Sequence, residues 1–343
     1  MLLDEPSWWY GGPDARAARL LAPLGTLYGW VAKARFNGQA PYRSHLPVIC
    51  AGNLTAGGSG KTPLAIYLCE QLKAAGQTPA LLTRGYGGRV RGPHWVAGTD
   101  GARDVGDEPL LLARAAPTVV ARDRRDGACA IEQAGSASVI VMDDGLQNPR
   151  LAKDLCLAVI DGERGLGNEH VIPAGPLRAP LPFQLELADA VVVTATPGGR
   201  ADDRVVDDLR RRFHGPVLRS TTEPTGDVHW LEAKRIVAWA GIGGPARFFS
   251  MLRSLGAELV ETVAFRDHQR LREADAARLL ALARRNRAAL VTTEKDMARI
   301  AGSAGTLAEL AGASRAVPIR VTFAGPDAER LSALIASALQ RRG

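Results

Sequence analysis

The sequence PVICAGNLTAGGSGKT, residues 47–62, decides the fold of this chain. Its apolar run 47–51 predicts a buried strand, and the segment after it repeats leucine at helical spacing, at Leu64, Leu68 and Leu72. Strand, glycine-rich turn, Lys-Thr and helix follow one another as in the phosphate-binding loop (P-loop) of nucleotide enzymes. Glycines let backbone N–H groups fold around phosphate oxygens, and the helix start adds the positive end of its dipole. The stretch therefore predicts a nucleotide site.

The predicted nucleotide ligands are the residues of this loop: Thr55, Ala56, Gly57, Gly58, Ser59, Gly60, Lys61 and Thr62. Lys61 is placed to reach the β- and γ-phosphates of ATP, and Thr62 is placed to ligate Mg²⁺. Thr55 stands where the general pattern has glycine, so the turn depends on Gly57 and Gly58.

A second glycine-rich segment, TRGYGG (83–88), follows the apolar run 79–83. Arg84 at the end of such a strand suits phosphate oxygens and is a further candidate nucleotide ligand. The alternative is a solvated arginine on a flexible turn.

Two acids follow another apolar run. Residues 138–142 lead directly into Asp143 and Asp144. A buried strand that ends in acids is where a P-loop protein holds the Mg²⁺ of its nucleotide, although Asp-Asp-Gly alone is more often a turn. Either aspartate is a candidate direct or water-mediated ligand, and the sequence does not rank them.

Two residues are candidates for proton transfer. Asp107 begins a predicted helix at 107–115, where an acid suits the helix dipole; the alternative is a carboxylate that accepts the proton of a substrate hydroxyl. His268 ends the motif Phe-Arg-Asp-His (265–268) after a predicted strand. A single histidine is usually structural, but this position leaves a catalytic or orienting role open.

Apolar runs alternate with helical patterns, which predicts an α/β fold with a largely parallel sheet covered on both faces. The predicted strands are 47–52, 79–83, 117–121, 138–142, 155–160 and 190–194, and the helices are 61–75, 107–115, 123–134 and 200–213. A second series has strands 235–240, 258–264, 288–293 and 317–323, with helices 244–255, 272–286 and 327–341. A linker near 220–232 divides the two, which gives a P-loop domain at 37–225 and a smaller α/β domain at 226–343.

Residues 1–36 form a separate segment that is rich in tryptophan. Its apolar side chains recur at helical spacing, namely Leu20, Leu21, Leu24, Leu27, Tyr28 and Val31. The apolar stretch 20–32 has 13 residues and is shorter than the roughly 20 that cross a bilayer. The stripe either packs on the body of the protein or lies in a membrane interface as an amphipathic helix.

The composition indicates which classes of partner the chain could bind. A net charge of +7 fits an acidic partner such as a nucleotide, a phosphorylated substrate or a phospholipid surface. Sparse aromatics (5%) and the lack of a basic stripe argue against nucleic acid. The four cysteines have no metal-binding spacing and are typical of buried residues in a reducing compartment.

Eight motifs in fixed order resemble the tetraacyldisaccharide 4′-kinase family, the lipid A 4′-kinases of Gram-negative bacteria. They are GNLTAGGSGKTP (52–63), TRGYGG (83–88), GDEP (106–109), DDGLQ (143–147), PAGPLR (173–178), AGIGGPARFF (240–249), FRDH (265–268) and TTEKD (292–296). The resemblance also accounts for Thr55, since the family's loop has threonine there.

The resemblance implies transfer of the ATP γ-phosphate to the 4′-hydroxyl of a tetraacyldisaccharide 1-phosphate, with Mg²⁺, in lipopolysaccharide biosynthesis. It implies that Asp107 and His268 act together as a base, in a cleft between two domains. It also implies peripheral attachment, through residues 1–36, to the cytoplasmic face of the inner membrane. The chain departs from the family at Ala179, where glutamate is frequent, and at 269–271, after the Asp-His pair.

One alternative function remains from the motifs alone. A P-loop NTPase that acts as a switch or metallochaperone on a protein partner would share the nucleotide loop. It would hydrolyse nucleotide without lipid and would not need the aromatic segment at 1–36.

Overall fold

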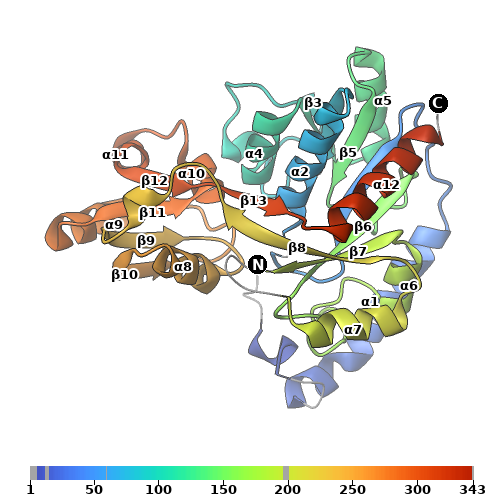
Figure 1. Ribbon diagram of the computed structural model, residues 1–343, viewed down its shortest axis with the longest axis horizontal. Coiled ribbons are helices and arrows are strands. Elements are labelled where there is room, and N and C mark those ends of the chain that lie inside the picture. The colour runs from blue at the N-terminus through green and yellow to red at the C-terminus, as the bar shows by residue number, and fades with distance from the viewer. Residues whose placement is uncertain (1–5, 12–14, 59, 196–200, 342–343) are drawn as a thin grey trace.

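A computed structural model describes residues 6–11, 15–58, 60–195 and 201–341 of the chain. Two sheets organise it, a nine-stranded sheet and a four-stranded sheet, set side by side (Figure 1). The predicted α/β class, with a P-loop sheet and a smaller second domain, is confirmed.

The larger sheet has the spatial order β13-β8-β7-β6-β1-β5-β2-β4-β3. Its strands are β1 (Val48–Asn53), β2 (Pro79–Thr83), β3 (His94–Trp95), β4 (Thr118–Val120), β5 (Val139–Asp143), β6 (Leu155–Asp161), β7 (Ala190–Ala195), β8 (Val217–Pro224) and β13 (Ile319–Thr322). All pairs are parallel except those of β3 and β13. β1, β5 and β6 are buried along their whole length, as continuous apolar runs predict for a sheet covered on both faces.

Helices cover both faces of this sheet. They are α2 (Lys61–Ala74), α3 (Ala102–Val105), α4 (Asp107–Ala115), α5 (Arg124–Ala134), α6 (Leu181–Glu186), α7 (Asp203–Arg212) and α12 (Pro326–Gln340). α2, α4 and α12 place leucines in the apolar core of one face. On the other face α6 and α7 place leucines and α5 places Ala128 and Ile131. These two cores fix β1 and β5, whose carboxyl ends carry the P-loop and the acidic pair.

The four-stranded sheet is parallel, in the order β10-β9-β11-β12. Its strands are β9 (Arg235–Ala240), β10 (Glu258–Ala264), β11 (Ala289–Thr293) and β12 (Ser314–Val317). Its helices are α8 (Pro245–Ser254), α9 (Glu273–Asn286), α10 (Glu294–Ile300) and α11 (Gly305–Ala313), and a short 3-10 turn, η2 (His229–Leu231), precedes β9.

The chain returns to the first domain at its C-terminal end, which differs from the predicted second domain at 226–343. A single strand was predicted at 317–323, but Pro318 separates β12 from β13, and β13 pairs antiparallel with β8 in the larger sheet. Proline lacks an N–H group and interrupts a ladder there. α12 then packs in the same core as α2. The predicted linker at 220–232 is also shorter in the structure, because β8 continues to Pro224.

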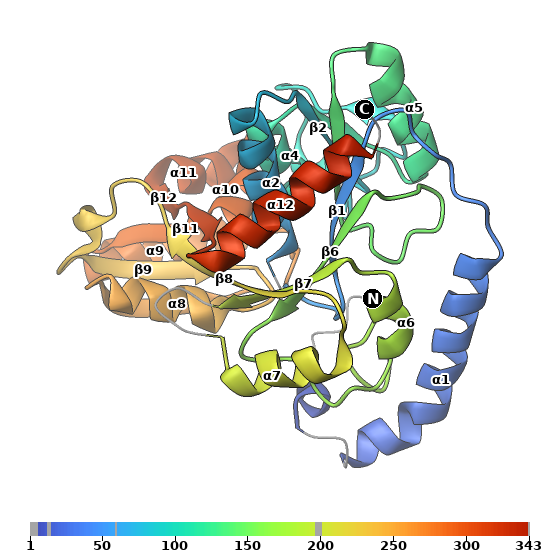
Figure 2. The same ribbon diagram turned by 45° about the vertical axis from the view of Figure 1, so that its right-hand side comes forward.

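The N-terminal part contains η1 (Ser7–Trp9) and α1 (Arg16–Asn37), which runs along the outside of the large domain near α6 (Figure 2). α1 docks through small residues: a Cβ at Gly25 would lie 2.5 Å from the Val171 carbonyl oxygen, and one at Gly29 would lie 3.1 Å from Pro180. Six large apolar side chains of α1 are exposed. We call them the apolar face of α1: Leu20, Leu24, Leu27, Tyr28, Trp30 and Val31, each at least 48% exposed.

α1 therefore packs on the body of the protein through its glycines, and its apolar face is exposed to solvent. The first alternative for the stripe, packing on the body, does not account for these exposed side chains. Leu21, predicted on the stripe, is half-buried. Within the described residues, no helix is long and apolar enough to cross a membrane.

Candidate active site

The P-loop joins β1 to α2 at the carboxyl edge of the larger sheet. Gly57 and Gly60 have φ values of 96° and 91°, a region that favours glycine, so the turn requires them there. The loop is fixed from outside, since the Ala56 N–H donates to the Pro176 carbonyl (2.7 Å) and the Thr55 carbonyl accepts from Arg178 Nε (3.1 Å). Ser59, a predicted ligand, lies outside the described residues. Ala56, Gly57, Gly58 and Lys61 line the cavity described below, and their role as nucleotide ligands stays a prediction.

Lys61 is the first residue of α2, with its ammonium 3.5 Å from Glu108 Oε1. Burial disfavours the ammonium, but the carboxylates of Glu108, Asp144 and Asp143 outweigh it and raise the pKa of Lys61 above its ordinary value. Lys61 is therefore a fixed positive charge at the P-loop.

Asp143 and Thr62 meet beside the P-loop. The Thr62 hydroxyl donates to Asp143 Oδ2 at 3.4 Å, and Asp143 Oδ1 is buried without a hydrogen-bond partner among the described residues. Burial raises the pKa of Asp143 to about 7, against the opposing charge of Lys61. An unpartnered carboxylate oxygen beside a threonine hydroxyl is the oxygen-donor pair that fits Mg²⁺ at a nucleotide.

Asp144 is arranged differently, although the sequence did not separate it from Asp143. It has a left-handed backbone (φ 59°), and its Oδ1 accepts from Arg178 Nη1 at 2.6 Å. The Arg178 charge and that of Lys61 outweigh burial and lower the pKa of Asp144 to about 2. Its carboxylate is already paired, so Asp143 fits a metal better.

Asp107 and His268 lie in contact, although they are far apart in sequence and come from different domains. His268 Nδ1 is 3.1 Å from both carboxylate oxygens of Asp107. Gly106 takes the N-cap position of α4 with φ 96°, so Asp107 is the first helical residue and its side chain is turned to the other domain. His268 has a φ of 56°, an uncommon backbone for a residue with a side chain, and such strain gathers at functional sites.

Further charged groups complete this contact, and sequence analysis assigned roles to none of them. Lys295 Nζ lies 3.2 Å from His268 Nε2, 3.2 Å from Asp267 Oδ1 and 3.3 Å from Glu108 Oε1. Arg299 Nη2 donates to Asp107 Oδ2 at 2.7 Å. Burial would raise the pKa of Asp107, but the His268 hydrogen bond and the charges of Lys295, His268 and Arg299 hold it well below its ordinary value.

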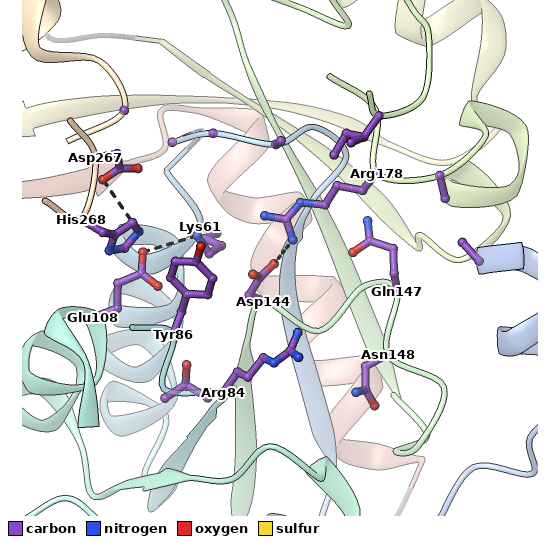
Figure 3. A pocket seen from close by; sticks show the side chains of 18 of the residues that line it. Lys61, Arg84, Tyr86, Glu108, Asp144, Gln147, Asn148, Arg178, Asp267 and His268 are labelled. Atoms are coloured by element: carbon purple, nitrogen blue, oxygen red, sulfur yellow. Dashed lines mark hydrogen bonds and ion pairs between the residues drawn. The ribbon is translucent and has the colours of Figure 1, made fainter. Parts of the chain in front are cut away.

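Part of this assembly opens into one cavity of about 1360 Å³ between the domains and α1 (Figure 3), whereas Asp107, Asp143, Thr62 and Arg299 lie behind its wall. Lys61, Glu108, Asp144 and His268 line its inner part, together with Arg84 and Tyr86 from the glycine-rich segment after β2. The Tyr86 and His268 rings meet edge to face, 5.0 Å apart. Side chains of η1 and α1 line the outer part: Trp9, Tyr28, Val31, Arg35 and Phe36. The cavity therefore connects a phosphate site to the N-terminal helix.

The second domain also touches the P-loop directly. Gly243, in the Gly-rich turn after β9, lies so close that a Cβ there would meet the Gly58 amide nitrogen at 3.0 Å. Arg247 of α8 binds the Asp161 carboxylate at the end of β6. Both domains thus contribute to the wall of the cavity.

This fold and site define the class of protein: a P-loop nucleotide-binding enzyme with a second α/β domain over its nucleotide loop. The family model "Tetraacyldisaccharide-1-P 4'-kinase" matches residues 17–340, and the chain belongs to that family. The family predicted from the motifs is thereby confirmed.

Relatives of known name are similar to this chain over nearly its whole length. The tetraacyldisaccharide 4'-kinase of Methylobacterium nodulans is 49% identical over 340 residues, covering 98% of this chain and 96% of the relative. That of Bradyrhizobium diazoefficiens is 46% identical, covering 99% and 97%. The LpxK of Aquifex aeolicus, solved in complex with ATP, is 24% identical with a TM-score of 0.73, covering 94% of this chain and 99% of that one, which supports the same fold.

Proposed function

We propose that this chain transfers the γ-phosphate of ATP to the 4′-hydroxyl of a tetraacyldisaccharide 1-phosphate in lipid A biosynthesis. The proposed reaction is supported by membership of the tetraacyldisaccharide 4'-kinase family. The site is supported by the Asp107–His268 contact, because His268 lines the same cavity as Lys61. An acceptor hydroxyl bound in this cavity would have the pair as its base, and the P-loop would hold the phosphate that the hydroxyl attacks.

The residues divide the work by chemistry. Backbone N–H groups of the loop 55–62 and the Lys61 ammonium bind the phosphates of ATP, and Arg84 contributes charge from the cavity wall. Thr62 and Asp143 would hold Mg²⁺, which supplies charge neutralisation at the β- and γ-phosphates when bound. The Asp107–His268 pair takes the proton of the attacking hydroxyl.

The test is a phosphoryl-transfer assay in detergent with ATP, Mg²⁺ and the tetraacyldisaccharide 1-phosphate. Lys61→Ala, Asp107→Ala and His268→Ala should each lower kcat by about 100-fold or more. His229→Ala is the matched control, since this histidine is in the second domain with its side chain 88% exposed. Wild-type rates in the Asp107 or His268 variant would contradict the site. ATP hydrolysis without a phosphorylated lipid would favour the NTPase switch.

We propose further that α1 places the cavity at the cytoplasmic face of the inner membrane. The apolar face of α1 is exposed, and the opposite side is docked on the body through Gly25 and Gly29. Arg16 and Lys33, exposed near its two ends, suit anionic lipid headgroups. The outer part of the cavity reaches the same helix, so an acylated substrate would enter from the bilayer surface.

Vesicle sedimentation tests this membrane contact. The triple change Leu20→Ser, Leu24→Ser, Leu27→Ser should release the protein from phosphatidylglycerol-containing vesicles while ATP binding is kept. Ile319→Ser, a change at an exposed apolar residue of β13, is the control. Equal binding by the triple variant and the wild type would contradict the proposal.

A further inference from the structure

Two lysines from different domains share one carboxylate oxygen in the cavity. The Nζ of Lys61, in the P-loop, lies 3.5 Å from Glu108 Oε1 (Figure 3), and the Nζ of Lys295, in α10, lies 3.3 Å from the same oxygen. All three side chains line the cavity and are 12–17% exposed. Two ammonium groups therefore converge on one position, which an anionic oxygen occupies in this structure.

Lys295 is held by the turn from β11 into α10. The Thr293 hydroxyl donates to Asp296 Oδ2 at 2.7 Å and accepts from the Asp296 N–H at 3.1 Å, so the backbone on both sides of Lys295 is fixed. Asp296 is fully buried and also accepts from the Gly241 N–H at 3.0 Å. Gly243, two residues further along, packs against the P-loop. The assembly that holds Lys295 therefore also touches the nucleotide loop.

The surroundings of Lys295 keep its ammonium protonated. Its other partners are Asp267 Oδ1 and His268 Nε2, each at 3.2 Å. Burial disfavours the ammonium, but the neighbouring carboxylates, Glu108 first among them, outweigh burial and raise the pKa of Lys295 above its ordinary value. Lys295 is therefore a positive charge with three N–H donors at neutral pH.

The shared oxygen of Glu108 marks a place for an oxygen of the nucleotide. The P-loop motif puts Lys61 at the β- and γ-phosphates of ATP, so a cation that shares an oxygen with Lys61 lies beside the outermost phosphate. Carboxylate and phosphate oxygens both accept short charge-assisted hydrogen bonds from an ammonium. The flexible stem of lysine lets Lys295 exchange one acceptor for the other while its backbone stays in place.

We infer that Lys295 binds a γ-phosphate oxygen of ATP and is a catalytic residue that the second domain supplies. The inference rests on the proposed function. In the transfer, the acceptor oxygen forms a bond to the γ-phosphorus, and the bond from that phosphorus to the bridging oxygen of ADP breaks. The hydroxyl proton moves to the Asp107–His268 pair. Lys295 keeps its own protons and donates one N–H to a non-bridging oxygen, so that one lysine from each domain balances the charge of the transferred group.

The test compares the affinities of ADP and of the non-hydrolysable analogue AMP-PNP, each with Mg²⁺, by titration calorimetry of the full chain. Lys295→Met should weaken AMP-PNP binding by about tenfold and ADP binding by less than about twofold, because only the analogue has a γ-phosphate. Lys295→Arg should keep part of the difference. Lys234→Met, at an exposed lysine of the second domain, is the matched control. Equal weakening of both nucleotides, or of neither, would overturn the inference.

A double variant separates contact with the phosphate from a simpler role, in which Lys295 only neutralises Glu108. If Lys295 binds the phosphate, Glu108→Gln combined with Lys295→Met should bind AMP-PNP about tenfold more weakly than Glu108→Gln alone. If Lys295 only neutralises the acid, the two variants bind AMP-PNP equally, which would overturn the inference.

Kinetics test the catalytic part. The kcat for transfer to the tetraacyldisaccharide 1-phosphate should fall by about 100-fold in Lys295→Met, as expected when a donor to the transferred group is removed. A wild-type kcat in this variant would overturn the catalytic role. If the wild type phosphorylates no lipid, the proposed function fails, whereas the nucleotide affinities need no acceptor and still decide whether Lys295 binds the γ-phosphate.

Discussion

At the scale of single residues, the two aspartates after β5 show how the surroundings separate identical side chains. Asp143 is buried with an unpartnered oxygen beside Thr62, and Asp144 is bound by Arg178. Their pKa values move in opposite directions, to about 7 and about 2. The sequence shows two adjacent acids, and only the packing distinguishes them.

Asp143→Asn should raise the Mg²⁺ concentration for half-maximal activity by about tenfold or more, because it replaces a charged oxygen ligand. Asp144→Asn is the matched control and should change this requirement less, since its carboxylate binds Arg178. A titration of kinase activity with Mg²⁺ measures both. A larger effect at Asp144 would reverse the assignment.

Asp107→Asn should destabilise the fold by about 3 kcal/mol at neutral pH, because it leaves buried Arg299 without its partner across the domains. The pKa of Asp107 is depressed in the folded state, so its stabilisation is complete above about pH 4 and is lost as the pH falls further. Urea unfolding at several pH values should show the two proteins converging in acid. A constant difference at every pH would contradict this account.

At the scale of elements, the most predictable parts were those with a strong local signal. β1, β5 and β6 are continuous apolar runs, and α2 has leucine at helical spacing after the P-loop motif. α11 and the division between β12 and β13 were not predicted, since short or amphipathic segments take their structure from what they pack against. Arg299 carries no local signal at all, because its partner Asp107 is 192 residues away.

The position of α12 is determined by the core that it packs in, which belongs to the P-loop domain. Leu331→Ala should lower the free energy of unfolding of the P-loop domain by about 2–4 kcal/mol, since the side chain is 1% exposed in the core that α2 also forms. Ser332→Ala, at an exposed neighbour, should change it by less than about 0.5 kcal/mol. Unfolding of this domain in urea can be measured by the loss of ATP binding. Loss of the second domain alone in Leu331→Ala would contradict the assignment of α12.

At the scale of the whole molecule, the site exists only where the two domains meet. Asp107 and the P-loop come from one domain, and His268, Lys295, Arg299 and Gly243 come from the other. The motifs named several of these residues in advance, but their mutual distances follow from the docking of the domains.

Gly243→Ala should separate the domains slightly, because its Cβ would meet the Gly58 nitrogen at 3.0 Å. We expect a higher KM for ATP and a kcat reduced by about tenfold or more, as small displacements at a reaction centre are costly. Gly244→Ala is the control, since a Cβ there approaches nothing closer than 3.6 Å. Equal kinetics for the two variants would show that this contact does not set the geometry.

The chain leaves the larger sheet and returns to it at neighbouring strands, which makes the second domain an insertion. The second domain leaves the larger sheet after β8 and returns at β13, and these exits are neighbours: the Thr225 N–H donates to the Pro318 carbonyl at 2.9 Å. The second domain is therefore an insertion into the larger sheet, with its two ends adjacent. Changes in the length of such an insert leave the strand order of the larger sheet unaltered, because both connections lie at one edge of that sheet.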